Sequence, residues 1–334
     1  MALRLIEVFV PQGEIGHVPA ALEGEEVLGI WTSELTGGQA VARVLLPSNQ
    51  TETVSDLLSQ HFETKEGFRL VLLPVEATLP APDAEAEAEE AAEELAKERP
   101  PERVSREELY QDIADAAKVS MVYVVTVALS TLVAAVGLIR GDVAIVIGAM
   151  VIAPLLGPNV ALSLASTLGD PALARRSLHA IGVGVGTALI LSLLLGFVVP
   201  VDPQVPELMS RARVDFADVA LAAAAGSAGC LAYTSGLPTA IVGVMVAVAL
   251  LPPLVATGLL AGAGYPSLAL GALMLLITNV TCVNLAGVVT FLAQKVRPRT
   301  WWDSERAKKA TRLAITSWLA MLAVLLFVIL FAWG

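Results

Sequence analysis

Long apolar windows without Asp, Glu, Lys or Arg constrain this chain more than any other feature of its sequence. The five windows cover residues 119–139, 143–169, 177–201, 219–294 and 313–334. A helix that crosses a bilayer takes about 20 apolar residues, so the longest window must hold several crossings. Two Gly- and Pro-containing sequences, at 235–238 and 262–266, divide it into three segments. The windows therefore predict an α-helical polytopic membrane protein with seven transmembrane helices.

Charge is divided unevenly along the 334 residues, of which 56% are hydrophobic and 16% are charged. Residues 1–118 contain 9 basic and 24 acidic side chains, a net charge of −15, whereas residues 119–334 contain 12 and 8, a net charge of +4. This contrast predicts an acidic soluble part that precedes the membrane part. The N-terminus is not expected to be a signal peptide, because Glu7 interrupts a short apolar stretch.

The first 78 residues predict a small α+β domain in the cytoplasm. Strand candidates lie at 3–10, 26–33, 40–46 and 68–74; helix candidates lie at 14–22 and from a cap at Asn49 or Thr51 to about His61. Thr36-Gly37-Gly38 is a hairpin signal between the two middle strands. The order βαββαβ is that of a ferredoxin-like unit. Such a domain could dimerise through its sheet or bind a small-molecule regulator, and the fold alone establishes neither.

An acidic linker at 79–104 and an amphipathic lead-in helix at 105–118 are predicted to join this domain to the membrane. The Ala/Glu run of the linker has no apolar face to bury, so we interpret it as a solvated spacer. Ser105, followed by Glu107 and Glu108, is a typical helix start. We expect the lead-in helix to continue without a break into the first spanning helix.

A duplicated segment underlies the membrane part. Between Gly148–Ala174 and Gly243–Ala269, 13 of 27 positions are identical, including the pairs Gly169/Gly264 and Pro171/Pro266. Three helices in each copy force the second copy to run through the bilayer in the opposite direction, which predicts an inverted repeat. The predicted segments are repeat 1 at 119–200, an extracytoplasmic connection at 201–213, repeat 2 at 214–294, a basic cytoplasmic loop at 295–312 and a seventh helix at 313–334.

Lys and Arg residues near the windows predict the orientation in the membrane. If residues 1–118 are cytoplasmic, that side holds fourteen of these cations, and the opposite side holds only Arg140, Arg211 and Arg213. We therefore expect a multi-pass protein of the plasma (inner) membrane, with the N-terminus in the cytoplasm and the C-terminus outside. The small-residue helix faces suit a homo-oligomer of several symmetries, and the Gly182/Gly186 spacing predicts close helix packing.

Enzyme and cofactor motifs are missing from the sequence. His17, His61 and His179 are isolated, Cys230 and Cys282 have no metal-ligand spacing, and there is no GxxxxGK[ST] phosphate loop. We expect no metal, no cofactor, no catalytic residue, no enzymatic activity and no nucleic-acid partner. The expected partners are the lipid bilayer, further copies of the chain and a small-molecule ligand of the cytoplasmic domain.

Prolines near the middle of two predicted spans mark the first candidate site. The sequences concerned are Pro154 with Gly157, Pro158 and Asn159, and the pair Pro252 and Pro253. A proline inside a helix removes a backbone donor and leaves carbonyls exposed, which the bilayer tolerates only against protein or a watery cavity. Two interpretations remain open: a kink relieved by packing, or a broken helix that lines a solute path.

Amides inside the apolar windows mark the second candidate. Asn159, Asn279 and Asn284 could form hydrogen bonds between helices, or they could coordinate a ligand or ion. Because the windows hold no carboxylate and no Lys or Arg, a proton antiporter is disfavoured, and a passive channel or a sodium-coupled carrier remains open. The second helix is flanked by Arg140, Asp142 and Asp170. Asp142 could simply begin that helix, or these residues could form a gate or vestibule.

A family resemblance rests on residues 141–158, which read GDVAIVIGAMVIAPLLGP. This segment resembles the signature of the bacterial and archaeal hydrophobic membrane proteins grouped as domain of unknown function 389, over about 110–295. The resemblance implies a membrane-protein architecture and transfers no substrate and no site residue. From the residues themselves, we predict a channel or secondary transporter for a small solute or ion, regulated by its cytoplasmic domain. The alternative is a membrane-anchored sensor of a small metabolite that does not transport.

Overall fold

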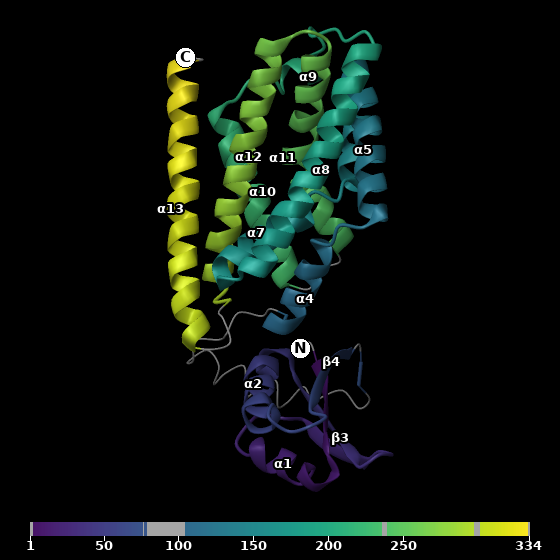
Figure 1. Cartoon of the computed structure of the whole chain (residues 1–334), viewed down its shortest axis with the longest axis vertical. Helices are drawn as coiled ribbons and strands as arrows, with labels where there is room; N and C mark the ends of the chain where they lie inside the picture. Colours follow the sequence, from purple (N-terminus) through teal and green to yellow (C-terminus); the bar gives the residue numbers. More distant parts are fainter. Residues whose placement is uncertain (1–2, 76, 79–103, 236–238, 297–300, 333–334) are drawn as a thin grey trace. The chain divides into compact units, whose positions relative to one another are not determined.

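The computed structural model describes residues 3–75, 77–78, 104–235, 239–296 and 301–332, of which 239–249, 301–307, 326 and 328–332 are described by their backbone alone. The chain forms two compact units, Met1–Glu108 and Leu109–Gly334. We call them the sheet unit and the helical unit (Figure 1). The predicted acidic linker at 79–104 lies outside the described residues except for Val104.

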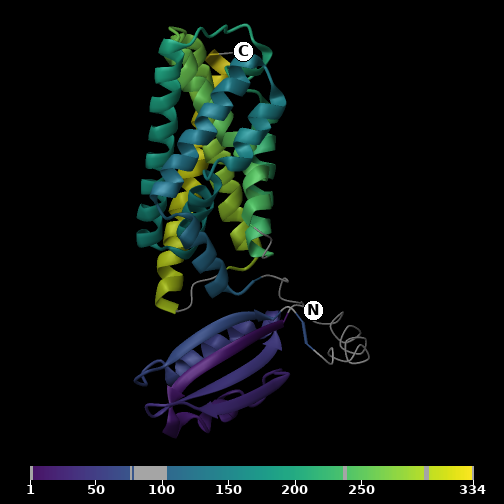
Figure 2. The same cartoon turned by 90° about the vertical axis from the view of Figure 1, so that its right-hand side faces the viewer.

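The sheet unit contains a four-stranded antiparallel sheet in the order β2-β3-β1-β4 (Figure 2). Its elements in chain order are β1 (Leu3–Pro11), η1 (Gln12–Glu14), α1 (His17–Ala21), β2 (Gly29–Glu34), β3 (Gln39–Pro47), η2 (Ser48–Gln50), α2 (Thr51–Phe62) and β4 (Arg69–Val75). The predicted element order is therefore present. The helix candidate at 14–22 is in fact two short pieces, and α2 has Gln50 at its N-cap without a side-chain hydrogen bond.

Alternation along β1 gives the sheet unit its core. Ile6, Val8 and Val10 are fully buried and belong to a cluster that includes Leu58 and Phe62 of α2. The alternate residues point to the other face of the sheet, where Glu7 accepts a 2.8 Å hydrogen bond from Arg43 of β3. The hydrophobic period of two thus decides which face packs against the helices.

The predicted hairpin is also present, because Gly37 and Gly38 between β2 and β3 have φ values of 86° and 77°. Both values lie in the left-handed region that glycine tolerates without a steric cost. Two consecutive residues of this kind match the right-handed twist of paired strands. The Gly-Gly sequence therefore allows the tight connection.

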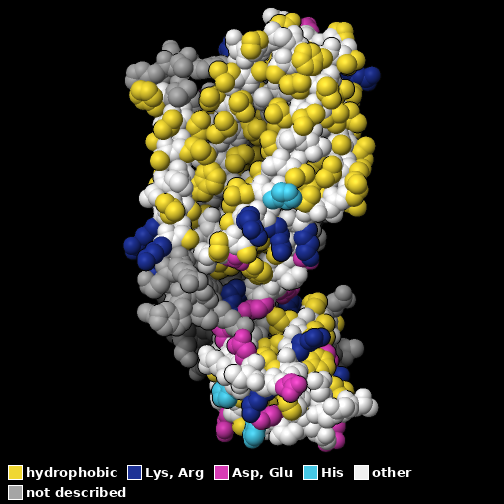
Figure 3. Space-filling view, viewed as in Figure 1, with side chains coloured by type: hydrophobic (Ala, Val, Ile, Leu, Met, Phe, Trp, Pro, Cys, Tyr) yellow, Lys and Arg dark blue, Asp and Glu magenta, His cyan; other side chains and the backbone are white. Residues whose placement is uncertain are grey.

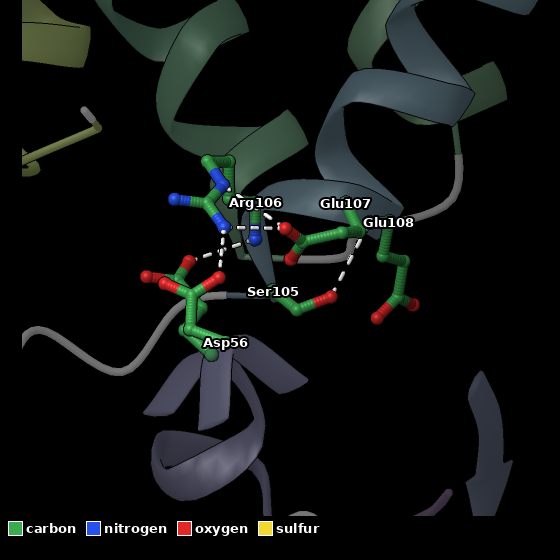
Figure 4. Close-up of polar contacts among 6 residues, drawn as sticks. Asp56, Ser105, Arg106, Glu107 and Glu108 are labelled. Atoms are coloured by element: carbon green, nitrogen blue, oxygen red, sulfur yellow. Dashed lines mark hydrogen bonds and ion pairs between the residues drawn. The ribbon is translucent and has the colours of Figure 1, made fainter. Parts of the chain in front are cut away.

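The lead-in helix α4 (Arg106–Ala116) ends before the first apolar helix begins. Ser105 accepts a 3.2 Å hydrogen bond from the Glu108 N–H, as its predicted role requires (Figure 4). The prediction of one continuous helix is wrong, because α5 starts anew at Met121. Ser120 is extended and its hydroxyl accepts from the Tyr123 N–H at 3.1 Å, so this side chain replaces the helical hydrogen bond that continuity would need.

The helical unit is a bundle of apolar helices (Figure 1). After the last eight residues of α4 it contains α5 (Met121–Arg140), α6 (Val143–Ile152), α7 (Leu156–Leu168), α8 (Pro171–Val198), α9 (Pro206–Met209), α10 (Phe216–Thr234), α11 (Thr239–Gly262), α12 (Pro266–Ala293) and α13 (Trp301–Ala332). The last helix, α13, lies beside α12 and α7.

Apolar helices indicate that the chain is a membrane protein. Among the residues that the structure describes, α5, α8, α10 and α12 are long and apolar enough to cross a bilayer, and the bent pair α6 and α7 would make a fifth crossing. Helices α11 and α13 each include residues whose side chains lie outside the description. The structure thus supports four or five crossings, and the count of seven stays a prediction.

Matched residues of the two sequence copies occupy matched structural positions. Gly169 and Gly264 have φ values of 68° and 84°, and each precedes a helix that begins with proline. Pro171 begins α8 and Pro266 begins α12, and both helices contain 28 residues. Proline suits the first helical position because its fixed φ is helical and because an N–H at this position would have no partner within the helix.

Close helix packing uses other glycines than the predicted pair. A Cβ atom added to Gly182 or Gly186 would meet nothing within 4 Å, whereas one at Gly184 would lie 3.0 Å from Leu155 Cδ2. The Gly182/Gly186 prediction is therefore wrong within this chain. Helices α8 and α11 approach closely instead through Gly196 and Gly262, where an added Cβ would lie 3.0 Å from backbone atoms of the opposite helix.

Candidate functional site

A break at residues 153–155 separates α6 from α7, whose axes differ in direction by 54°. Ala153 has φ −68° and ψ 119°, the extended conformation that a following proline favours. Ala153 still donates to Ala149 O at 3.2 Å. Within the described part of the chain, the N–H groups of Leu155 and Leu156 form no such bond. Pro154 therefore accounts for the break, which leaves backbone donors without helical partners.

The second sequence copy is not broken at the matching place. Helix α11 continues from Thr239 to Gly262 with Pro252 and Pro253 inside it, so the prediction of matched breaks is wrong. The physical reason lies in the sequences of the two copies. Pro154 corresponds to Ala249, so of the two prolines near the break only Pro158 has a proline, Pro253, at the matching position. Pro158 itself lies in the first turn of α7, where a missing N–H costs little.

Gly157 is a point of close contact inside the helical unit. A Cβ atom at this position would lie 2.7 Å from Ala116 Cβ and 2.9 Å from Ala116 O. The last residue of α4 thus touches the first turn of α7. Earlier in α4, the Tyr110 hydroxyl donates to Asp170 Oδ2 at 2.7 Å. The pKa of Tyr110 is raised, first by burial and then by this carboxylate.

Two of the predicted amides meet between α7 and α12. Asn284 Nδ2 donates to Asn159 Oδ1 at 3.1 Å, and Ser163 Oγ lies 3.3 Å from Asn284 Oδ1. The side chains of Asn159, Ser163 and Asn284 are all buried, and we call them the amide bridge. Asn284 Nδ2 also donates to Val280 O at 2.9 Å, and Asn159 Nδ2 donates to Leu155 O at 2.8 Å.

This geometry matches the interpretation of hydrogen bonds between helices. Ser163 lies four residues after Asn159, on the same helix face, and this spacing could have marked it as a further site residue. Gly287 makes room for it, since a Cβ there would lie 2.6 Å from Ser163 Oγ. Asn279, five residues before Asn284, takes no part in the amide bridge. Its neighbour Thr278 is fully buried, and its hydroxyl has no partner within the described residues.

The predicted gate residues divide into two caps and one exposed cation. Asp142 Oδ1 accepts from the N–H groups of Ala144 and Ile145 at 3.0 and 3.2 Å. Asp170 Oδ1 accepts in the same way from Ala172 and Leu173 at 2.9 and 3.0 Å. Both carboxylates thus begin helices, α6 and α8. Arg140 is the exposed last residue of α5.

The site offers polar and backbone groups for binding but little titratable chemistry. Over the described ranges, no group of three or more His, Cys, Asp or Glu residues could hold a metal ion. Cys230 and Cys282 are free and buried. The arrangement at the break therefore consists of main-chain groups, the amide bridge and the proline ring, all inside a helical bundle.

These features indicate a membrane protein in which, among the described residues, the apolar pair α6 and α7 is interrupted by a bend. The chain belongs to the family described as Domain of unknown function (DUF389), whose model matches residues 150–285. An uncharacterized protein of Methanocaldococcus jannaschii is 36% identical over 332 residues, which cover 99% of this chain and 100% of the relative. No solved structure matches. The family resemblance of the GAMVIAPLLGP segment is thereby confirmed.

Proposed function

We propose that this chain is a channel or secondary transporter for a small solute or ion, and that the break between α6 and α7 lies on its path. The single observation behind this proposal is the extended residue Ala153 before Pro154, in the middle of an apolar segment. Non-helical backbone at membrane depth is tolerated where it is buried in protein or lines a watery cavity. Interrupted helices of this kind form the binding sites of many transporters.

The chemistry around the break suits solutes that need no ionised partner. Residues 143–169 contain no Asp, Glu, Lys or Arg, so a proton relay through side chains is disfavoured. Carbonyls and amides can coordinate a monovalent cation or form hydrogen bonds with a neutral polar solute. We therefore propose passive conduction or sodium-coupled transport without enzymatic activity, metal or cofactor.

The finer architecture is part of the same proposal. The order β2-β3-β1-β4 in a βαββαβ chain supports a ferredoxin-like fold for the sheet unit. Helices α5 to α8 and α10 to α12 are proposed to form an inverted repeat, supported by Gly169 and Gly264 before the matched prolines. With α13, the proposed total is seven crossings, with the N-terminus in the cytoplasm, the C-terminus outside and a homo-oligomer in the inner membrane.

Regulation by the sheet unit is proposed to act through the lead-in helix α4. Within the sheet unit, Arg106 at the start of this helix pairs with Asp56 at 2.9 Å and its N–H donates to Glu52 at 2.7 Å (Figure 4). Within the helical unit, Ala116 at the end of the same helix touches Gly157. A ligand that changes the first turn of α4 would thus act on the helix whose last residue contacts α7.

The test is a flux assay with the full chain in liposomes, using Na⁺, K⁺, Cl⁻ and the neutral solute glycerol. Pro154→Ala removes the residue that favours the break, so flux of the conducted solute is expected to fall. Pro158→Ala is the matched control, because this proline lies in the first turn of α7 and its replacement should leave flux close to wild type. Equal flux in all three proteins would contradict a path at the break.

Folded protein that conducts none of these solutes would overturn the transport proposal. Tight binding of a small metabolite by the same protein would then favour the sensor alternative. Hydrogen exchange of α6 and α7 in the Pro154→Ala protein would show directly whether the break has closed. This readout separates a loss of the break from a general loss of structure.

A further inference from the structure

A hollow of about 380 Å³ lies on the surface of the first turns of α8, lined by Ala172, Arg175, Arg176 and His179. The positions i, i+3, i+4 and i+7 lie on one face of a helix, so these side chains surround the same space. All four residues are exposed. Figure 3 shows Lys and Arg side chains gathered at one end of the hydrophobic surface of the helical unit.

Neither arginine of the hollow forms an ion pair with another described residue. The nearby carboxylates are occupied by other donors. Asp170 accepts from two backbone N–H groups and from Tyr110. Asp115, which lies close enough to feel the charge of Arg176, pairs with Lys118 Nζ at 2.7 Å and accepts from Gln111 at 3.0 Å. Two guanidinium groups are therefore left to attract an anion.

Apolar surface begins directly beside the hollow. Leu178 follows the arginines and is 57% exposed, and further along α8 the side chains of Ile190, Leu194 and Phe197 are 64%, 53% and 69% exposed. A helix with this pattern presents its apolar side to lipid chains and its cations to the headgroup level. An anion bound in the hollow would thus be next to the hydrocarbon surface.

We propose that this hollow binds the phosphodiester headgroup of an anionic phospholipid such as phosphatidylglycerol. Guanidinium groups match phosphate oxygens with paired hydrogen bonds, and a neutral or charged imidazole also has an N–H to donate. A lipid with a quaternary ammonium headgroup would bring a cation next to Arg175 and Arg176. The site should therefore prefer the anionic lipid, whose chains can cover Leu178 and the apolar surface beyond it.

The experiment is native mass spectrometry of the delipidated full chain, titrated with dioleoylphosphatidylglycerol or dioleoylphosphatidylcholine. The tightest binding event of wild type should be selective for phosphatidylglycerol. The double variant Arg175→Gln/Arg176→Gln should weaken that event about 30-fold, since each cation near an anionic headgroup contributes about a factor of five. The control Arg140→Gln/Arg213→Gln removes two exposed cations elsewhere in the helical unit and should bind as wild type.

Three outcomes would overturn the proposal. The first is unchanged phosphatidylglycerol binding in the folded Arg175→Gln/Arg176→Gln protein. The second is equal affinity of wild type for the two lipids. The third is displacement of the lipid by inorganic phosphate at the lipid's own concentration, which would indicate a site for the free anion. The Arg175→Lys/Arg176→Lys protein keeps both positive charges. Partial phosphatidylglycerol binding by this protein would support the proposal even if the glutamine variant proves unstable.

Discussion

The amide bridge between α7 and α12 should couple these helices energetically, and a double-mutant cycle can measure the coupling. The proteins are wild type, Asn159→Ala, Asn284→Ala and the double variant. Asn284 Nδ2 donates to Asn159 Oδ1 at 3.1 Å in buried surroundings. Replacing either residue leaves the other amide buried without this partner. Each single variant should therefore lower the free energy of unfolding by about 1–3 kcal/mol.

The coupling energy should be smaller than the single losses. Side-chain hydrogen bonds between membrane helices contribute about 0.6 kcal/mol on average and up to about 1.7 kcal/mol. The cycle isolates one such bond, so we expect a coupling of about 0.6–1.7 kcal/mol. Equilibrium unfolding of the full chain in mixed micelles, with increasing SDS, would supply the four free energies.

A matched control is the cycle of Asn159→Ala with Asn279→Ala. Asn279 lies on the same helix as Asn284 but takes no part in the amide bridge, so its coupling to Asn159 should be close to zero. If the Asn159/Asn284 coupling were also zero, the two amides would not form a bridge in the membrane. If flux fell in Asn284→Ala with unchanged stability, a coordinating role would replace the structural one.

Three further changes test single contacts. Gly157→Ala should lower the free energy of unfolding by about 1–3 kcal/mol, because its Cβ would lie 2.7 Å from Ala116 Cβ. The control Gly148→Ala adds a Cβ with nothing within 4 Å and should be neutral or slightly stabilising in the same SDS titration. Tyr110→Phe removes the 2.7 Å bond to Asp170 and should cost about 1 kcal/mol at neutral pH. Because the pKa of Tyr110 is raised in the folded chain, the stability that its hydroxyl contributes should be complete below about pH 10 and be lost as the pH rises through the raised pKa. Equal free energies of unfolding of wild type and Tyr110→Phe at neutral pH would contradict this prediction. Arg106→Gln should increase hydrogen exchange in the first turn of α4, since the guanidinium bonded to Asp56 is lost; unchanged exchange, with Arg43→Gln as the control, would show that this ion pair does not hold the turn.

Local sequence patterns were enough to predict most strands and the hairpin of the sheet unit. Alternating apolar residues place Ile6, Val8 and Val10 on one face of β1, and Gly37-Gly38 permits the hairpin because both residues need positive φ. The exact helix starts were less predictable. Several neighbouring residues could occupy the N-cap position of a helix. Helix α2 begins after Gln50 and lacks the side-chain cap predicted from Asn49 or Thr51.

In the helical unit, a sequence motif gives the spacing of residues along a helix but does not say which face of that helix packs against a neighbour. Gly182 and Gly186 have the spacing for close packing, yet Gly184, on another face of α8, meets Tyr123 and Leu155. The end of α4 was missed because Ser120 offers a cap that hydrophobicity does not reveal. By contrast, the unequal breaks could have been read from the sequence, since Ala249 stands where the first copy has Pro154.

The two sides of the break are held by different kinds of contact. Helix α7 is fixed at Gly157 by Ala116, in its middle by the amide bridge, and at its end by Thr311 of α13, whose hydroxyl lies 3.2 Å from the carbonyl oxygens of Ser166 and Thr167. Helix α6 presents Val143, Ile147 and Val151 as exposed side chains, and its other face, with Val146 and Met150, is buried in the core of the helical unit. Polar side chains thus fix α7, whereas apolar packing holds α6. A solute path at Ala153 would therefore run between two halves of a helix that are both packed into the bundle, and the main-chain groups of the break, rather than a loose helix, would have to line it.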